Sequence, residues 1–196
     1  MICTLAEIKA DLGLADTVDD AVLQLLIDSL EGRFESHLNR SLLRTVGAVE
    51  LFDGGEHCLL VARFPVETVT SVHQSADQTW DATTLLDGAD GEFIVNYQRG
   101  RLYYGHGGFD WPWGVQNIRV VYTGGYVAGG TLPGAGQTAM PDGIRHAFKL
   151  QCAFLWRNWR NLGSSGVSSQ GTNINLSPVD LLPEVKQALA PFIRYG

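Results

Sequence analysis

The sequence lacks the features that identify a disulfide-stapled, metal-binding or membrane-spanning protein. Only three of its 196 residues are cysteines (Cys3, Cys58 and Cys152), and they are far apart with no CxxC spacing. This excludes a disulfide framework and predicts reduced, small apolar side chains. No apolar run approaches the ~20 residues that span a bilayer. The opening residues lead straight into helical sequence, so we expect no signal peptide and a soluble protein made in a cytoplasm.

Recognisable catalytic and cofactor motifs are missing as well. There is no GxxxxGK[ST] loop, and the glycine-rich stretch 105–114 neither follows a suitable strand nor opens a helix. The five histidines show no HxxxH or HExxH spacing. No Gly-x-Ser-x-Gly elbow surrounds the serines of residues 163–171. We therefore predict no enzyme, no cofactor and no metal site.

Charge is scarce and unevenly distributed. Charged residues make up 18% of the chain and the net charge is −7, which argues against a general nucleic-acid coat. Residues 1–40 hold eight acidic and three basic residues, whereas residues 141–196 hold three acidic and six basic ones. An acidic N-terminal stretch and a basic C-terminal stretch suit subunits that meet head to tail in a ring. The alternative is that both are ordinary solvated surfaces.

The first 43 residues have the pattern of a short helix, a turn and a long amphipathic helix. Thr4 and Glu7 have capping-box spacing, and Gly13 lies where a helix C-cap needs a positive φ. One arc of the second helix is apolar and the opposite arc is acidic and polar. The apolar arc consists of Val22, Leu23, Leu26, Ile27, Leu30, Phe34 and Leu38.

The rest of the chain changes character twice. Residues 44–127 contain short alternating or apolar runs separated by Gly and Asp turns, which predicts about six antiparallel strands in a sheet or small barrel. Residues 128–140 are glycine-rich and are expected to form a flexible linker. Residues 141–196 return to helical periodicity. We predict an α+β fold in which residues 1–43 and 141–196 form a helical bundle from both ends of the chain, with 44–127 as an inserted β-rich subdomain.

Four ordered segments resemble the head–tail connector (adaptor, or head completion) family of tailed bacteriophages. The first is the Asp19-Asp20 turn with the long helix that ends near Leu38-Asn39-Arg40-Ser41-Leu42. The others are Pro65–Val72, Val120–Tyr126 and Met140–Ala147, and the Leu182-Pro183-Glu184-Val185 stretch fits too. The long strand region departs from the family's smallest, almost entirely helical members.

The resemblance implies a structural subunit in a ring of about twelve copies. Its expected partners are further copies of itself, the portal protein and the next neck or tail protein, with genomic DNA passing close by and no membrane contact. The expected location is the head–tail junction of the virion, after synthesis in the bacterial host cytoplasm. The alternatives are a nucleic-acid-binding module and another neck protein, a stopper or tail terminator.

Two sets of charged residues are candidate surfaces of such a ring. Asp28, Glu31 and Glu35 would line a central channel and repel DNA phosphates, unless they are simply a solvated helix face. Arg145, Lys149, Trp156 and Arg160 share an arc of the third helix and would face the acidic second helix of a neighbouring subunit. Binding of single-stranded nucleic acid, or a surface with no specific partner, are the alternatives for this arc.

Two apolar sets are candidate docking surfaces. By analogy with the family, the C-terminal segment would reach the portal through Leu182, Val185, Leu189, Phe192, Ile193, Arg194 and Tyr195. Phe109, Trp111 and Trp113 lie in one loop and would anchor a partner if exposed. Packing of the tryptophans on the sheet is the alternative.

Overall fold

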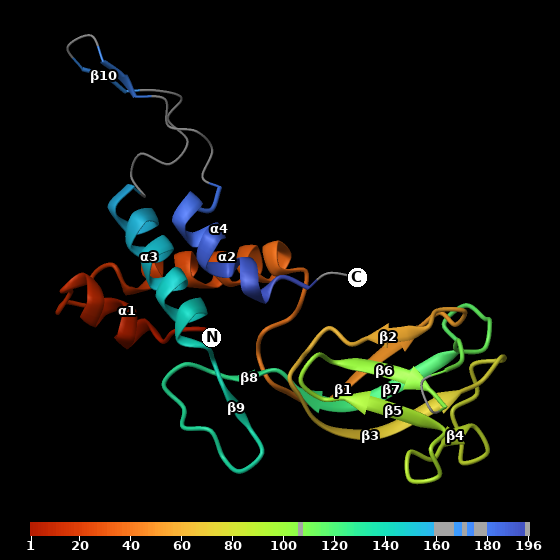
Figure 1. The fold of residues 1–196 in the computed structure, drawn as a ribbon. Coiled ribbons are helices and arrows are strands. Elements are labelled where there is room, and N and C mark those ends of the chain that lie inside the picture. Colours follow the sequence, from red (N-terminus) through yellow and green to blue (C-terminus); the bar gives the residue numbers. More distant parts are fainter. Residues whose placement is uncertain (106–107, 159–166, 170–171, 175–179, 195–196) are drawn as a thin grey trace. The chain divides into compact units, whose positions relative to one another are not determined.

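The computed structural model describes residues 1–105, 108–158, 167–169, 172–174 and 180–194, with 167–169 and 172–174 as backbone only. It is a mixed α and β structure with four α-helices in the described residues and antiparallel sheets, as predicted (Figure 1). The chain divides into two compact units. We call Met1–Leu38 with Met140–Arg194 the helical unit, and Asn39–Ala139 the β unit.

The helical unit takes its four α-helices from two distant stretches of sequence. These are α1 (Leu5–Leu12), α2 (Asp20–Leu38), α3 (Asp142–Asn158) and α4 (Pro183–Leu189), which continues into the 3₁₀ turn η2 (Ala190–Phe192). Between α3 and α4, β10 (Val167–Ser169) and β11 (Thr172–Ile174) pair as an antiparallel hairpin. The predicted capping box of α1 is confirmed: Glu7 N–H donates to Thr4 Oγ1 at 3.2 Å, and Thr4 N–H donates to Glu7 Oε2 at 2.8 Å.

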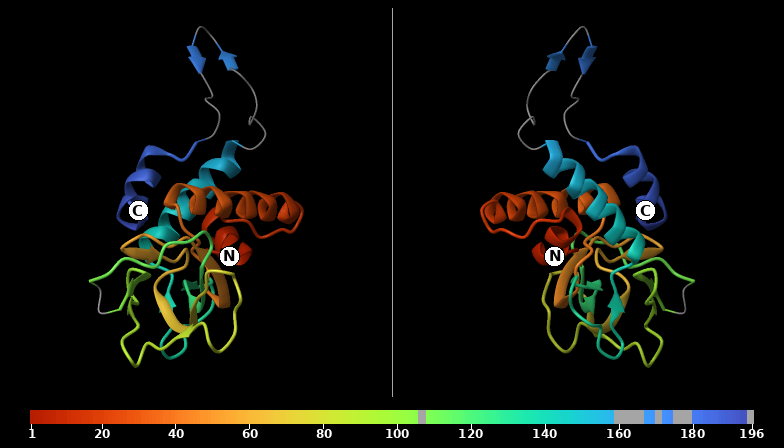
Figure 2. Two further views of the ribbon diagram at one scale, coloured as in Figure 1. Left: turned by 90° about the vertical axis from the view of Figure 1, so that its right-hand side faces the viewer. Right: turned by 90° about the vertical axis from the view of Figure 1, so that its left-hand side faces the viewer.

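Helix α3 is the central element of this unit, because it contacts α1, α2 and α4 (Figure 2). The rings of Phe34 on α2 and Phe148 on α3 meet edge to face, with their centroids 5.3 Å apart. The predicted apolar arc of α2 supplies five buried side chains: Leu23, Ile27, Leu30, Phe34 and Leu38. Burying each such side chain stabilises the fold by roughly 1.5–3 kcal/mol. Packing therefore dominates the stability of this unit.

The β unit contains two antiparallel sheets. The larger has the order β1-β7-β3-β4, formed by Thr45–Phe52, Ile118–Gly124, Val66–Gln74 and Leu85–Leu86. The smaller has the order β2-β6-β5, formed by Cys58–Leu60, Arg101–Tyr104 and Phe93–Asn96. Residues 44–127 thus contain six strands of three or more residues, in agreement with the prediction of about six antiparallel strands. In addition, β8 (Tyr126–Val127) and β9 (Thr138–Ala139) pair in parallel, so the stretch 128–140, predicted as a linker, contains a short strand.

One continuous core lies between the two sheets. Val72, Val120 and Tyr122 from the larger sheet share it with Leu59 and Leu102 from the smaller one. Alternation explains this, because every second residue of a strand points to the same face. Trp111, which is 1% exposed, belongs to the same core.

Tyr122 on β7 forms hydrogen bonds both with β1 and with the segment that follows β2. Tyr122 Oη donates to Glu50 Oε1 and accepts from the backbone N–H of Arg63 at 3.0 Å. The other carboxylate oxygen of Glu50 accepts from the N–H of Ala62 at 3.0 Å. Burial, followed by the hydrogen bond to Glu50, raises the pKa of Tyr122, so its hydroxyl stays protonated and donates.

We expect Tyr122→Phe to destabilise the β unit by about 1–3 kcal/mol, because Glu50 and the Arg63 N–H each lose the buried Tyr122 hydroxyl as a hydrogen-bond partner. Urea unfolding followed by tryptophan fluorescence measures the loss, since Trp111 lies in this core. The control is Tyr97→Phe at a ring that is 49% exposed, which should cost less than about 0.5 kcal/mol. Equal effects of the two variants would show that the hydroxyl of Tyr122 contributes nothing.

Candidate functional site

The acidic arc of α2 is not a uniform row of solvated carboxylates. Asp28 is exposed and accepts a hydrogen bond from Gln24 Nε2 at 2.8 Å. Glu31 is half-buried and accepts from the backbone N–H of Ile2, and Glu35 is also half-buried. Of the three predicted channel residues, Asp28 is therefore the one whose side chain is most accessible to solvent.

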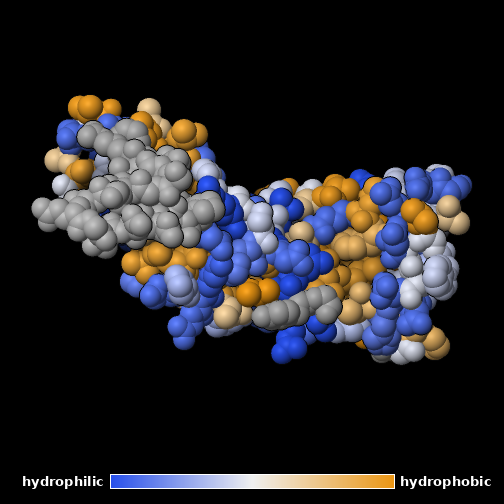
Figure 3. All heavy atoms as spheres, turned by 90° about the horizontal axis from the view of Figure 1, so that it is seen from above, coloured by the Kyte–Doolittle hydropathy of each residue, from blue (hydrophilic) through white to orange (hydrophobic). Residues whose placement is uncertain are grey.

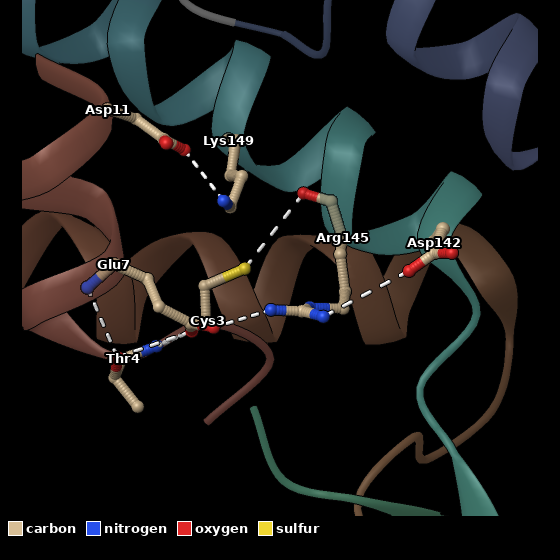
Figure 4. Close-up of polar contacts among 7 residues, drawn as sticks. All are labelled: Cys3, Thr4, Glu7, Asp11, Asp142, Arg145 and Lys149. Carbon is tan, nitrogen blue, oxygen red and sulfur yellow. Dashed lines mark hydrogen bonds and ion pairs between the residues drawn. The ribbon is translucent and has the colours of Figure 1, made fainter. Parts of the chain in front are cut away.

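The predicted basic arc of α3 makes ion pairs with α1 of the same chain (Figure 4). Arg145 Nη2 contacts Glu7 Oε1 at 2.5 Å, and Lys149 Nζ contacts Asp11 Oδ2 at 2.8 Å. Glu7 and Asp11 are one turn apart on α1, as Arg145 and Lys149 are on α3, so the pairs lie in register along the two helices. A second carboxylate, Asp142, lies 4.0 Å from Arg145 Nη1.

These ion pairs reduce the positive charge that the basic arc of α3 presents to a neighbouring subunit. The charges of Arg145 and Lys149 are balanced within the chain, although both side chains keep about 30% of their surface exposed. Trp156 is half-buried, and Arg160 lies outside the described residues. The role of this arc as a subunit interface stays a prediction, and the alternative of single-strand binding has fewer uncompensated cations to use.

The electrostatics of the α1–α3 contact follow from these pairs. Burial opposes ionisation of Glu7, but hydrogen bonds from Thr4 and the charge of Arg145 outweigh it and lower the pKa of Glu7 below 4.5. The hydrogen bond to Asp11 raises the pKa of Lys149. Burial raises the pKa of the Cys3 thiol, whose Sγ lies 3.9 Å from the carbonyl oxygen of Arg145, and raises that of Cys152 to about 11. Both thiols are therefore protonated near neutral pH.

Part of the predicted portal-docking segment is core. Val185 and Leu189 are fully buried in the helical unit, and Leu182 N–H donates to Gln151 Oε1 of α3 at 2.9 Å. The side chains of Val185 and Leu189 therefore pack within their own chain. The half-buried residues are Leu182, Phe192, Ile193 and Arg194, and Tyr195 lies outside the described residues. Any docking surface here is the outer side of α4 and the residues that follow it.

The aromatic loop divides into one buried and two exposed residues. Trp111 is a core residue whose Nε1 donates to the carbonyl of Leu102 at 3.3 Å, so the packing alternative applies to it. Phe109 is 68% exposed and Trp113 is 90% exposed. Buried Asn117 holds the loop, accepting from Gly54 N–H at 2.9 Å and donating to the Pro112 carbonyl at 2.8 Å.

Exposed hydrophobic residues are numerous on the β unit, where orange covers a broad area on the right of Figure 3. On the outer face of the larger sheet, Val49 is 53% exposed and Leu51 is 45% exposed, both on edge strand β1. Sequence reasoning did not single these residues out. The sequence signal that could have identified them is their alternation with Ala48, Glu50 and Phe52, because alternate residues of a strand point to opposite faces of the sheet.

Within the described part of the chain, no group of three or more His, Cys, Asp and Glu side chains could hold a metal ion. None of the helices described is long and apolar enough to cross a bilayer.

Comparison with known structures identifies the class of fold. A chain from the neck of an empty GTA particle, computed with C6 symmetry, aligns with a TM-score of 0.56 and 16% identity over 95% of this chain and 89% of that one. A chain from the virion of a native gene transfer agent (GTA) particle aligns with a TM-score of 0.55 and 17% identity over 98% and 89%. At these identities the likeness concerns the fold alone.

The sequence comparison is more specific over part of the chain. Residues 2–68 match the family of phage gp6-like head-tail connector proteins, so the resemblance predicted from the sequence is confirmed there. The matched stretch covers α1, α2, β1, β2 and the start of β3. No curated protein matches the chain.

We expect Glu7→Gln to weaken the acid sensitivity of the helical unit. Because the pKa of Glu7 is lowered on folding, its contribution to stability is present above pH 4.5 and is lost as the pH falls through the folded-state pKa. Wild type should therefore lose more unfolding free energy than the variant between about pH 5 and pH 3. The control is Asp16→Asn, at an exposed carboxyl in the turn after α1. Identical pH profiles for wild type and Glu7→Gln would contradict the assignment.

Proposed function

We propose that this protein is a structural, non-enzymatic subunit of a neck ring that joins a phage-type portal to the tail or to the next neck protein. The observation that carries the proposal is the match of residues 2–68 to the head-tail connector family. The similarity of nearly the whole fold to a chain from a GTA neck supports it.

The same comparison supports a closed ring. The related neck was computed with C6 symmetry, and a ring of about twelve copies is compatible with that symmetry. In this proposal the helical unit contributes to the wall of the ring, with the exposed carboxylate of Asp28 toward the DNA channel. The outer side of α4 and the residues after it contact the portal. The virion is then the site of action.

We expect portal to trigger ring assembly. Sedimentation of the 21.4 kDa chain with purified portal should give a complex that contains many copies, whereas a compact monomer indifferent to portal would contradict the proposal. Ile193→Asp should weaken the complex, because it puts a charge on the proposed docking segment. Gln98→Glu, at an exposed position of the β unit, is the charge-matched control. Binding only to a preformed adaptor ring would instead favour the stopper alternative.

A separate prediction concerns the channel. Asp28→Lys should make the ring–portal complex retain double-stranded DNA at low salt, because it replaces a repelling charge with an attracting one. Filter binding measures retention, and Asp90→Lys at an exposed carboxyl of the β unit is the matched control. Equal retention by both variants would contradict a channel position for Asp28. Salt-sensitive DNA binding by the wild-type chain alone would favour the nucleic-acid-binding alternative.

A further inference from the structure

The β unit has an open groove of about 840 Å³ between the edges of its two sheets. Its lining exposes polar and apolar surface in similar measure, and Val69 and Leu86 on the larger sheet and Phe93 and Val95 on the smaller one supply apolar side chains. Leu85 and Ile94, both also in the lining, are 48% and 43% exposed. Asp87 is the charged residue of the lining.

The two sides of the groove are strand edges. β5 is the last strand of its sheet, and β3 pairs with β4 through Val72 and His73 alone. At one end the sheets are joined by a hydrogen bond from Val66 N–H to the carbonyl of Tyr97 at 2.7 Å. Among the described residues, no backbone hydrogen bond covers the groove side of 67–71 or 93–96. Apolar side chains beside unpaired backbone groups fit an extended polypeptide segment.

The β unit also contains an uncharged segment between β8 and β9. We call this segment, residues 129–137, the arm (Figure 1). Its Leu132 is 91% exposed, and no charged residue occurs between Ala128 and Met140. Hydrogen bonds from Thr131 N–H to the Ala128 carbonyl (3.2 Å) and from Gln137 N–H to the Gly134 carbonyl (3.1 Å) shape the arm. The β8–β9 pairing fixes its two ends.

We propose that the arm of one subunit occupies the groove of the next, with Leu132 against the apolar lining. The occupant is a second copy of this chain because the arm carries no charge and one exposed leucine, while the groove offers apolar side chains, unpaired backbone groups and a single charged residue. Its own groove does not hold it, since Leu132 is 91% exposed in the single chain. Arm and groove are different surfaces, so the contact is heterologous and propagates from copy to copy until a ring closes. The inference rests on the proposed ring and identifies one of its contacts.

Engineered disulfides test the contact directly. Leu132→Cys and Ile94→Cys are combined with Cys58→Ser, because Cys58 is the native cysteine that is not fully buried. After oxidation of the portal-bound ring, a non-reducing gel should show a ladder of linked subunits. The control pairs Ile94→Cys with Val115→Cys, which is 76% exposed and outside the groove lining. Rings without the ladder, a link within one chain, or an equal ladder from the control would overturn the proposal.

A second variant separates this inference from the proposed function. Leu132→Asp should reduce ring assembly about tenfold or more, the scale of losing one interface anchor, without changing the melting temperature of the free chain. Val115→Asp is the matched control and should assemble normally. If wild type forms rings and Leu132→Asp forms them equally well, the arm contact is wrong and the ring stands. If wild type forms no ring with portal, the proposed function fails and the arm contact with it.

Discussion

The helical unit depends on the burial of α3 against segments from both ends of the chain. Phe148 meets Phe34 of α2 in an edge-to-face contact, and α4 covers another side through Val185 and Leu189. On the third side, Arg145 and Lys149 pair with α1. Exposed ion pairs contribute little stability, so the apolar contacts hold the helices together and the ion pairs fix the register of α1 on α3.

In the β unit, a buried polar side chain fixes the loop that carries an exposed aromatic residue. Asn117 has 1% of its surface exposed, and its two hydrogen bonds hold the loop that presents Trp113 to solvent. The indole lies across Gly55, where a Cβ atom would come within 3.1 Å of Cε2. These contacts limit the conformations open to the exposed indole, and such a limit reduces the side-chain freedom that a residue loses on binding.

Local signals made much of the fold predictable. The capping box of α1, the apolar arc of α2 and the six longer strands all depend on residues close in sequence. The two-residue strands β4, β8 and β9 are too short to have a period. Among the site residues, Trp111 and Trp113 are of one type and two positions apart, yet one is buried and the other exposed. Likewise, the acidic partners of Arg145 and Lys149 are chosen by the packing of α1 on α3, which composition does not reveal.

The division of the chain into units has a consequence for its synthesis. The β unit is continuous in sequence, whereas α2 ends at Leu38 and its main partner α3 begins at Asp142. At typical translation rates the ribosome needs on the order of 5 to 20 seconds to make the intervening residues. During that time the apolar face of α2 has no α3 to pack against, whereas the β unit is complete as soon as Ala139 has been added. The β unit can therefore fold before the helical unit, whose N-terminal helix pair has to wait for α3 and α4.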